Sequence, residues 1–378
     1  MAEIKLHALI DPHVHFRTPG AEHKETWETA ARAAIKGGVT TVLDMPNNTP
    51  ACTNVKQLYK KKALIDEALG QVGIPLRYGL YLGAESEHLD QIEVARGEIA
   101  ALKIYMGSST GGLTMCDRES LAEAFRLAAK NNVLVVVHAE DEALIAERTR
   151  RYFDPNNPAC HSQIRSPEVA MRAVAEAIGM AQTSGARLYI AHVSTEGELN
   201  LIRKAKSEGL PIYAEATPHH LFLDDTFYAK LGSFALVNPP LRSRRDQAAL
   251  WHGIEDGTID TIGTDHAPHT RAEKAMPYGK APSGFPSIEV YLALLLNAHN
   301  QGRISLETIA SLTYHNPRAI FRLPENDDVV WVDLNRVKTV DPKHLATKAG
   351  WTPYDGWSLQ GWPRYTVLRG QTFDVEAM

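Results

Sequence analysis

The sequence has few of the features that mark membrane, secreted or nucleic-acid-binding proteins. Its three cysteines, Cys52, Cys116 and Cys160, are scattered and odd in number, and they match neither a disulfide framework nor a metal motif. A net charge of −5 gives no basic surface for nucleic acid or an anionic membrane. No segment approaches the ~20 apolar residues of a membrane span, and the N-terminus has no signal-peptide core. We therefore expect a cytoplasmic protein with reduced thiols that binds neither nucleic acid nor membranes.

Short apolar or β-branched runs alternate with longer amphipathic segments through most of the 378 residues. With 44% hydrophobic residues, a chain of this length can bury a large core. Apolar residues recur at helical spacing in segments 26–36, 55–69, 120–131, 170–183 and 196–207. The expected strands are 7–15, 40–45, 76–82, 100–105, 133–138, 187–192, 211–216 and 258–263. Eight strands with intervening helices predict the α/β class, as a parallel (β/α)8 TIM barrel.

The character of the chain changes after about residue 326. Residues 329–332 and 366–368 have the pattern of strands, in a region where tryptophan and proline are frequent. We therefore expect residues 1–325 to form the barrel, and residues 326–378 to form a small β appendage packed on it.

The run from Asp11 to Arg17 is the most informative motif in the chain. It reads Asp-Pro-His-Val-His-Phe-Arg and follows an apolar segment typical of a buried strand. Side chains alternate along a strand, so His13 and His15 point the same way and can bind one ion together. Two imidazoles without a nearby cysteine suit a catalytic divalent metal such as zinc. Alone this motif is weak, since most His-x-His pairs are unrelated histidines.

Other expected strands also end in polar residues that can bind metal. The fourth ends in Lys103-Ile104-Tyr105, the fifth in His138 and the sixth in His192, while Asp265 follows the eighth. Each has an ordinary explanation, such as a surface histidine, a helix cap or a salt-bridge lysine. In a parallel barrel, however, the carboxyl ends of the strands form the functional face. One shared site explains the set better than several coincidences.

Lys103 stands in a strand expected to be buried on both faces, where a charged ammonium group is costly. Burial lowers the pKa of a lysine, which leaves some neutral amine. A neutral amine can add carbon dioxide to give a carbamate, and the two oxygens of a carbamate can bridge two metal ions. In that arrangement one ion would bind His13, His15 and Asp265, and the other would bind His138 and His192. Hydroxide between two such ions is a strong nucleophile at neutral pH.

The order of these residues resembles the binuclear-zinc members of the amidohydrolase superfamily, and among them the dihydroorotases. The pattern is closest to the dihydroorotase portion of animal multifunctional pyrimidine enzymes and to bacterial class I relatives. Many relatives carry further β structure before the first barrel strand, so the appendage here is expected to be incomplete. The matching strings are residues 11–17, 45–47, 102–105, 218–221, 238–242 and 265–269, with shorter matches at 315–317 and 351–353.

The resemblance implies reversible cyclisation of N-carbamoyl-L-aspartate to L-dihydroorotate, a step of pyrimidine synthesis. It implies two zinc ions per chain, bridged by carboxylated Lys103, and a zinc-bound hydroxide whose proton Asp265 carries. Arg17 lies two residues beyond His15, so its guanidinium is expected to hold the substrate carboxylate. Ser109 and Thr110 stand where the family has a mobile lid, although the animal form carries a different pair. The other substrate contacts implied are Asn47, Asn238, His269, Ser283 and Gly284.

Two other readings stay open. Dihydropyrimidinases, hydantoinases and allantoinases share the metal ligands, so the ligands alone do not separate these cyclic amidases from a dihydroorotase. An inactive relative could also serve as a structural partner of aspartate carbamoyltransferase, although such proteins typically lose ligands. We expect a small-molecule substrate, a homodimer and an association with aspartate carbamoyltransferase. His219 and His220 are assigned structural roles, Glu140 and Glu215 are ambiguous, and His161 and Arg165 are assigned no chemistry.

Overall fold

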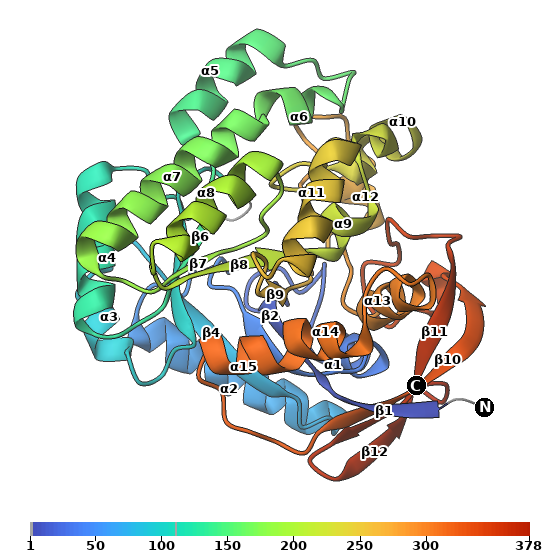
Figure 1. The fold of residues 1–378 in the computed structure, drawn as a ribbon. Coiled ribbons are helices and arrows are strands. Elements are labelled where there is room, and N and C mark those ends of the chain that lie inside the picture. Colours follow the sequence, from blue (N-terminus) through green and yellow to red (C-terminus); the bar gives the residue numbers. More distant parts are fainter. Residues whose placement is uncertain (1–2, 110–111) are drawn as a thin grey trace.

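The computed structural model describes residues 3–109 and 112–378, which form an eight-stranded barrel with a second, smaller sheet at its side (Figure 1). The barrel strands are parallel and neighbour one another in chain order, from β2 to β9. This confirms the predicted (β/α)8 TIM barrel. The strands are β2 Leu9–Val14, β3 Val39–Asp44, β4 Arg77–Gly83, β5 Ala101–Tyr105, β6 Val135–His138, β7 Leu188–Ile190, β8 Ile212–Ala216 and β9 Thr261–Ile262.

The barrel closes between β2 and the residues that follow β9. Val14 forms a parallel bridge with His266, and the backbone N–H of His15 donates to the carbonyl of His266 at 2.8 Å. Nearer the start of β2, the buried carboxylate of Asp11 accepts the backbone N–H of Thr264 at 2.9 Å. A side chain thus replaces part of the strand ladder at this seam. The replacement explains why β9 is shorter than the expected strand 258–263.

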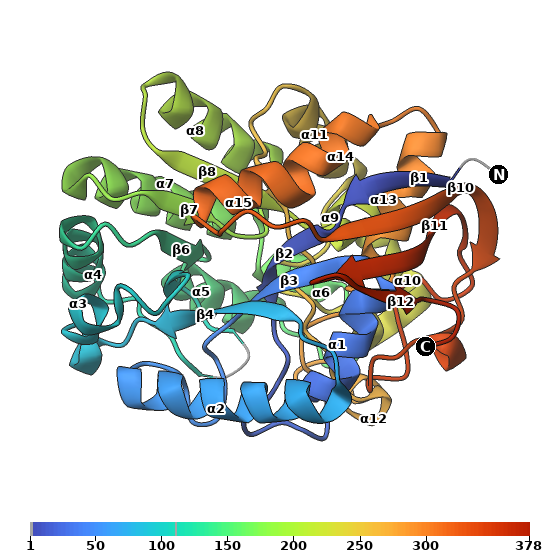
Figure 2. The same cartoon turned by 90° about the horizontal axis from the view of Figure 1, so that it is seen from below.

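Helices surround the barrel, as Figure 2 shows from below. The five amphipathic segments of the sequence all form helices, within about three residues of the expected bounds. None of the helices in the described part of the chain is long and apolar enough to cross a membrane. The longer helices are α1 Trp27–Lys36, α2 Val55–Val72, α4 Arg118–Lys130, α5 Glu142–Tyr152, α7 Pro167–Ser184, α8 Glu196–Ser207, α11 Arg244–Glu255 and α13 Tyr291–Asn300. The short ones are α3 Gln91–Ala95, α6 Cys160–Ile164, α9 Pro218–Phe222, α10 Tyr228–Leu231, α12 Arg271–Lys274, α14 Leu306–Ala310 and α15 Asn316–Ile320.

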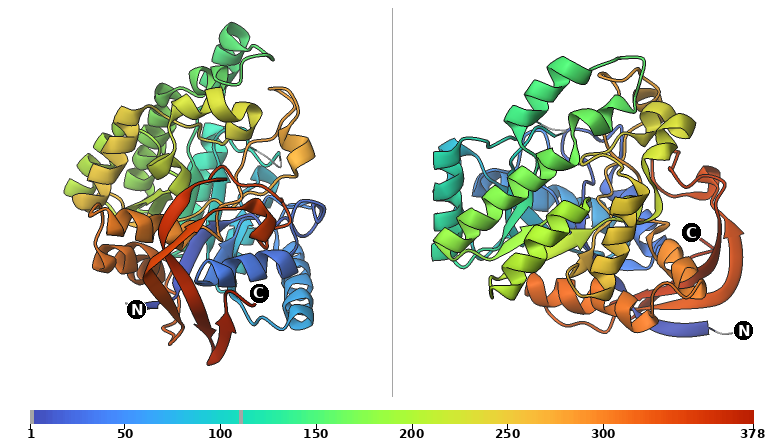
Figure 3. Two further views of the ribbon diagram at one scale, coloured as in Figure 1. Left: turned by 90° about the vertical axis from the view of Figure 1, so that its right-hand side faces the viewer. Right: turned by 45° about the horizontal axis from the view of Figure 1, so that its top comes forward.

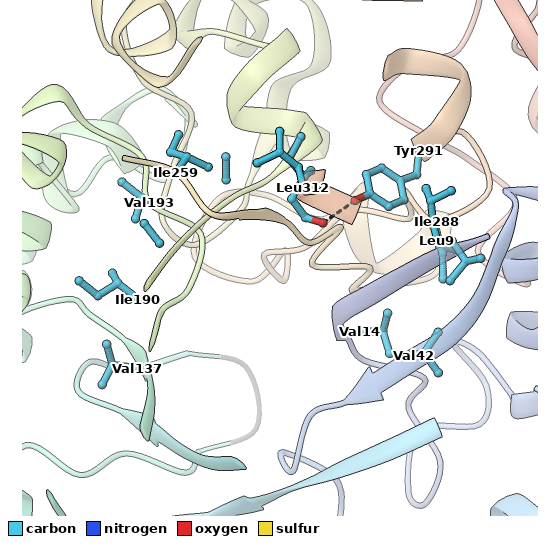
Figure 4. Close-up of a cluster of buried hydrophobic side chains, with 14 of the residues drawn as sticks. Leu9, Val14, Val42, Val137, Ile190, Val193, Ile259, Ile288, Tyr291 and Leu312 are labelled. Carbon is cyan, nitrogen blue, oxygen red and sulfur yellow. Dashed lines mark hydrogen bonds between the residues drawn. The ribbon is translucent and has the colours of Figure 1, made fainter. Parts of the chain in front are cut away.

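The main core lies between the strands and the helices (Figure 4). β-Branched side chains such as Val42 and Ile190 point outward from the barrel into this layer and are fully buried. Tyr291 of α13 reaches in from outside, and its hydroxyl donates to the carbonyl of Ile262 at the end of β9. The lower interior of the barrel is filled by Tyr81, Tyr189 and Phe321. The barrel is therefore a packed scaffold that leaves its polar groups at one end.

The second sheet is antiparallel, in the order β1-β10-β11-β12, and both chain termini lie beside it (Figure 3). Its strands are β1 Glu3–His7, β10 Val329–Thr339, β11 Ser358–Leu368 and β12 Gln371–Asp374. The expected single strand 7–15 is wrong in one respect, because the chain changes sheets at Ala8. β1 alternates between partly buried and exposed residues, whereas β2 is buried throughout. The appendage therefore includes the N-terminal strand as well as the C-terminal tail.

Candidate active site

Three of the expected metal ligands converge at the carboxyl ends of β2 and β9. Nε2 of His13 lies 3.3 Å from Oδ1 of Asp265, and Nε2 of His15 lies 3.1 Å from the same oxygen. Possible ligand atoms of these three residues all fall within 4.8 Å of one another. All three side chains are buried, so an ion bound there would be largely removed from water. The strand alternation that predicted a shared histidine face is confirmed.

Two acceptors fix which ring nitrogen of each histidine faces this cluster. Nδ1 of His13 lies 2.7 Å from Oε1 of Glu215, and Nδ1 of His15 lies 2.7 Å from Oδ1 of Asn47. In each case Nδ1–H donates to the oxygen, which leaves the Nε2 lone pair directed at Asp265. Such contacts orient metal-binding histidines and fix their tautomers. Burial lowers the pKa of His15 to about 4, despite the opposing effect of Asp265, so its ring is neutral at pH 7.

A second pair of histidines lies beside the first. Nδ1 of His138 is 2.9 Å from Nε2 of His192, and the ring of His192 lies 5.4 Å from that of His13, centroid to centroid. Nε2–H of His138 donates to the carboxylate of Glu140 at 2.9 Å, so the Nδ1 lone pair faces His192. Burial lowers the pKa of both histidines. Both are therefore neutral at pH 7, as metal binding requires.

Lys103 is buried on β5, and its Nζ has no hydrogen-bond partner among the described residues. Burial lowers its pKa to about 8, although the charges of Glu215 and Asp265 act in the opposite direction. An amine with this pKa is partly neutral at physiological pH. Nζ lies 5.1 Å from the centre of the Tyr105 ring, but a buried amine without a hydrogen bond is still costly, which indicates an unmet interaction.

The carboxylate of Asp265 is ionised in this environment. Burial raises its pKa, but the neighbouring rings of His13, His15 and His192 hold the pKa well below its usual range. The backbone at Asp265 is also unusual, with φ of 46°. Positive φ occurs at six non-glycine residues in the described chain, and three of them, Arg17, His192 and Asp265, belong to this site. Such clustering is typical of functional sites, where tertiary contacts hold an unfavourable backbone conformation.

A narrow cavity opens next to the His-His-Asp cluster. Its lining includes two of the expected metal ligands and most of the residues that the sequence predicted to contact the substrate. Thr110, the other expected lid residue, lies outside the described residues. The lining consists of His15, Arg17, Asn47, Ser109, Val237, Asn238, Asp265, Ala267, Ser283 and Gly284.

Arg17 is a buried cation on the wall of this cavity, with 7% of its surface exposed. Its Nε donates to the carbonyl of Pro268 at 3.0 Å, and one terminal nitrogen lies 3.1 Å from Nε2 of His269. No ion pair joins it to a carboxylate within the described ranges. Burial lowers the pKa of Arg17 to about 10, so the group stays charged at neutral pH. The cavity therefore offers a desolvated guanidinium group to an anionic ligand.

His269 does not line the cavity itself but joins Arg17 to the neighbouring loops. Nδ1 of His269 lies 3.0 Å from Nζ of Lys24, and Nε2 lies 3.0 Å from the carbonyl oxygen of Ser283. Burial, together with Arg17 and Lys24, holds the pKa of His269 well below its usual value. Gly284 follows with φ of 141°, and a Cβ there would lie 2.5 Å from the carbonyl oxygen of Ala267. Only glycine fits this close approach of two backbones.

Several residues of the site were missed or left ambiguous by the sequence reading. Glu215 and Glu140 are now assigned as the carboxylates behind His13 and His138. Lys274 is fully buried, and its Nζ donates to the carbonyls of Leu236 and Pro282 at 2.9 Å, next to the Asn238 and Ser283 loops. A carboxylate inside an otherwise apolar strand was the available signal for Glu215. Nothing in the sequence around Lys274 marks it as buried.

The two adjacent histidines on α9 lie outside the ligand cluster, as expected. Nε2 of His220 lies 3.1 Å from the carbonyl of Pro239, and its Nδ1 lies 2.8 Å from the hydroxyl of Thr217. The first contact holds the loop that carries Asn238, and the second is local to the start of α9. His219 is completely buried beside the ring of Phe285, and neither of its ring nitrogens has a hydrogen-bond partner in the described structure.

Comparison with known proteins agrees with this geometry. Residues 4–322 match the model of the amidohydrolase family. The dihydroorotase of Halobacterium salinarum is 37% identical over 376 residues, which cover 97% of this chain and 85% of the relative. The dihydroorotase of Methanosarcina mazei is 35% identical over 399 residues, with 99% of this chain and 84% of the relative covered. The dihydroorotase of Brevibacillus brevis is 35% identical over 377 residues, covering 96% and 86%.

Solved structures of similar shape carry other names. The L-hydantoinase (dihydropyrimidinase) of Arthrobacter aurescens superposes with a TM-score of 0.91 at 25% identity, covering 98% of this chain and 85% of that one. The dihydropyrimidinase of Brevibacillus agri NCHU1002 gives a TM-score of 0.88 at 26% identity, covering 98% and 84%. These proteins share the fold, while sequence identity is higher with the proteins named dihydroorotase. The chain belongs to the amidohydrolase family.

Proposed function

We propose that the chain is a dihydroorotase, which interconverts N-carbamoyl-L-aspartate and L-dihydroorotate. The observation that carries the proposal is the cavity in which Arg17, a buried cation without a carboxylate partner in the described chain, lies beside His15 and Asp265. Both proposed substrates carry a carboxylate that takes no part in the bond making or breaking. A buried guanidinium binds such a group bidentately and strongly.

The donor set fits two divalent ions, which we propose to be zinc. His13, His15 and Asp265 would hold one ion, because their ligand atoms already lie close together. His138 and His192 supply only two nitrogens for a second ion, so that site needs another donor. Carboxylated Lys103 would supply it, and the buried position of its Nζ, which makes no hydrogen bond in the described structure, supports this modification. Bound zinc would lower the pKa of water and polarise the amide carbonyl.

Asp265 is proposed to carry the proton. In the hydrolytic direction its ionised carboxylate accepts a proton from the attacking water and passes it to the ring nitrogen as the amide bond breaks. In the synthetic direction the carboxylate accepts a proton from the attacking ureido nitrogen and gives it to the carboxyl oxygen that departs as water while the ring closes. The lowered pKa keeps this carboxylate ionised at neutral pH, as the first proton transfer of hydrolysis requires. Its place at the junction of the ligands and the cavity supports both roles.

The remaining cavity residues are proposed to orient the substrate. Asn47 and Asn238 offer amide groups from two different loops at the cavity, and Ser283 and Gly284 offer backbone groups to the ring. His269 would add a second contact near the carboxylate that Arg17 binds. Ser109 and Thr110 are proposed as the lid residues, and Ser109 already borders the cavity.

The rival reading is a hydantoinase or dihydropyrimidinase, favoured by the likeness in shape to those enzymes. Their ring substrates, hydantoin and dihydrouracil, carry no carboxylate on the ring and would leave the buried Arg17 unpaired, which is unfavourable. An inactive scaffold is disfavoured because every expected ligand residue is present in the chain, and His13, His15 and Asp265 lie close together. A homodimer, an association with aspartate carbamoyltransferase and a cytoplasmic location are further proposals. The last agrees with the three free cysteines.

The purified protein should be assayed in both directions with dihydroorotate and carbamoyl aspartate, and then with dihydrouracil, hydantoin and allantoin. We expect turnover of the first two substrates and little of the others. Faster hydrolysis of dihydrouracil than of dihydroorotate would overturn the assignment. Metal analysis should accompany the assay, with about two zinc ions per chain as the proposed value. Less than one ion per active chain would contradict the binuclear site.

A further inference from the structure

The short helix α6 and the two residues after it, 165 and 166, reach the site from a distant part of the chain. This segment lies between α5 and α7, at the top of Figure 1. The proposed reaction uses none of its residues. Two of its polar side chains, His161 and Arg165, are nevertheless buried, with 6% and 8% of their surface exposed. Each contacts a different half of the proposed site.

Arg165 reaches the side of the site where His138 lies. One terminal nitrogen donates to Oε2 of Glu140, the same oxygen that accepts Nε2–H of His138. The other donates to the carbonyl of Ser108 at 2.6 Å. Arg165 therefore holds the carboxylate behind His138 and, with the same guanidinium group, the backbone next to Ser109, which borders the cavity.

The fit between these segments is close. A Cβ at Gly107 would lie 2.5 Å from the carbonyl oxygen of Glu140, so the two backbones are in contact where Arg165 joins them. Arg242 supports the arrangement from behind, since it donates to the carbonyl of Arg165 and, at 3.1 Å, to the hydroxyl of Ser194. Glu140 is wholly buried and depends on Arg165 for the balance of its charge. Removal of the arginine would leave a buried carboxylate with one fewer partner, which is costly.

His161 reaches the substrate side. Its Nε2 lies 2.9 Å from Oδ1 of Asn238 and 3.0 Å from the carbonyl of Val237, and both of these residues line the cavity. Its Nδ1 lies 3.1 Å from the hydroxyl of Tyr278. Both neighbours of Nε2 are oxygens, so Nε2 carries the hydrogen and donates to Oδ1 of Asn238, which fixes the orientation of that amide group.

Packing of the segment does not require either polar group. Cys160 and Ile164 already anchor α6 in an apolar cluster with Leu144 and Val169. Burial of a guanidinium group and an imidazole adds desolvation costs that apolar side chains would avoid. Their positions are better explained by the groups that they contact.

We propose that residues 160–166 form a two-armed positioning brace, in which Arg165 sets His138 through Glu140 and His161 sets Asn238. Neither is a catalytic residue. The inference rests on the proposed function, because the activity assays use its substrate. Zinc binding, however, tests the Arg165 arm without any substrate. The two arms should therefore give different defects when removed. Loss of Arg165 should weaken metal retention and turnover, whereas loss of His161 should weaken substrate affinity.

Arg165→Met should weaken zinc binding to the metal-free protein by roughly 10- to 100-fold, as loss of a supporting contact behind a ligand does. It should lower kcat, with KM changed less. Arg165→Lys keeps the charge but cannot reach Glu140 and Ser108 together, so it should fall between Arg165→Met and the unmodified protein. His161→Leu should raise KM roughly three- to tenfold, with zinc affinity unchanged. Zinc affinity is measured by competition with a chromophoric chelator, and cobalt substitution adds a spectrum of the ligand geometry.

Two matched variants control for loss of stability. Arg77→Met removes an arginine paired with Asp328 at 2.7 Å at the opposite end of the barrel, and His299→Leu removes a histidine that contacts the carbonyl of Ile304. Both should lower the melting temperature without altering zinc affinity or KM. Unchanged zinc affinity in Arg165→Met, or unchanged KM in His161→Leu, would overturn the brace. If the unmodified protein prefers another cyclic amide, the proposed function fails, and the same variants still test the brace with that substrate.

Discussion

Oε1 of Glu215 lies 2.7 Å from Nδ1 of His13 in a wholly buried pair. The same oxygen accepts the backbone N–H of His192 at 3.0 Å. One carboxylate on β8 therefore fixes a side chain on β2 and the backbone after β7. The ring of His13 can present only Nε2 to an ion, which makes the ligand geometry a property of the barrel itself.

The first prediction concerns Lys103. As a carbamate it would join both metal sites, so Lys103→Ala should abolish most activity and weaken retention of the ion bound by His138 and His192. Added acetate or propionate should restore part of the activity, because a small carboxylate can occupy the space of the missing bridge. Metal content and turnover with and without the added acid measure this. Normal turnover in the alanine variant would exclude a bridging role.

The second prediction concerns Asp265. General acid–base groups contribute ~100- to 10,000-fold to rate. Asp265→Asn keeps the size of the side chain but cannot carry a proton, so kcat should fall by about this factor in both directions. Binding of substrate, followed by calorimetry, should persist because Arg17 and the cavity are intact. A variant with near-normal rates would place the proton carrier elsewhere.

The third prediction concerns the pH dependence of stability at Glu273, which caps α12 and lies 3.1 Å from Lys24. Burial raises its pKa, but hydrogen bonds from Thr270 and the charge of Lys24 together lower it to about 2. A carboxyl group with a lower pKa in the folded state stabilises the fold above about pH 4.5 and loses this contribution as the pH falls toward 2.

Glu273→Gln should therefore reduce the free energy of unfolding at pH 7 by on the order of 1 kcal/mol. The difference from the unmodified protein should narrow as the pH falls from 5 to 3. Urea denaturation across this range is the measurement. Glu208→Gln, at an exposed glutamate 3.9 Å from Lys204, serves as the control. A difference that stays constant with pH would contradict the assignment of this pKa.

The barrel could be predicted because its signals are local. Each strand is a short apolar run, and each of the five predicted helices has apolar residues at helical spacing, so composition and periodicity place them within a few residues. The convergence of two candidate ligands could be predicted for the same reason, since strand alternation determines that His13 and His15 point the same way. The change from one sheet to the other at Ala8 could not be predicted. An apolar run continues through this residue, and only the pairing of β1 with β10 separates β1 from β2.

The supporting residues of the site depend on long-range contacts that no local pattern encodes. Arg165 and Glu140 are 25 positions apart, and His161 and Asn238 are 77 apart. The loop from 154 to 166 has the composition of an exposed segment, yet its last residues fold over the strand ends. Lys274 lies in an ordinary charged helix sequence and is nevertheless fully buried. The roles of such residues can be assigned only when the three-dimensional positions of the loops are known.

The central claim is that this cavity recognises the carboxylate of dihydroorotate, and Arg17 tests it most directly. Removal of one partner of a buried ion pair costs on the order of 3–5 kcal/mol. Arg17→Met should therefore lower kcat/KM for dihydroorotate and carbamoyl aspartate by roughly two to four powers of ten. Zinc content should not change, because Arg17 is not a ligand. The decisive measurement is kcat/KM of both proteins for dihydroorotate and for dihydrouracil, which lacks the carboxylate. A large loss confined to dihydroorotate is expected, whereas equal losses on the two substrates would contradict the account.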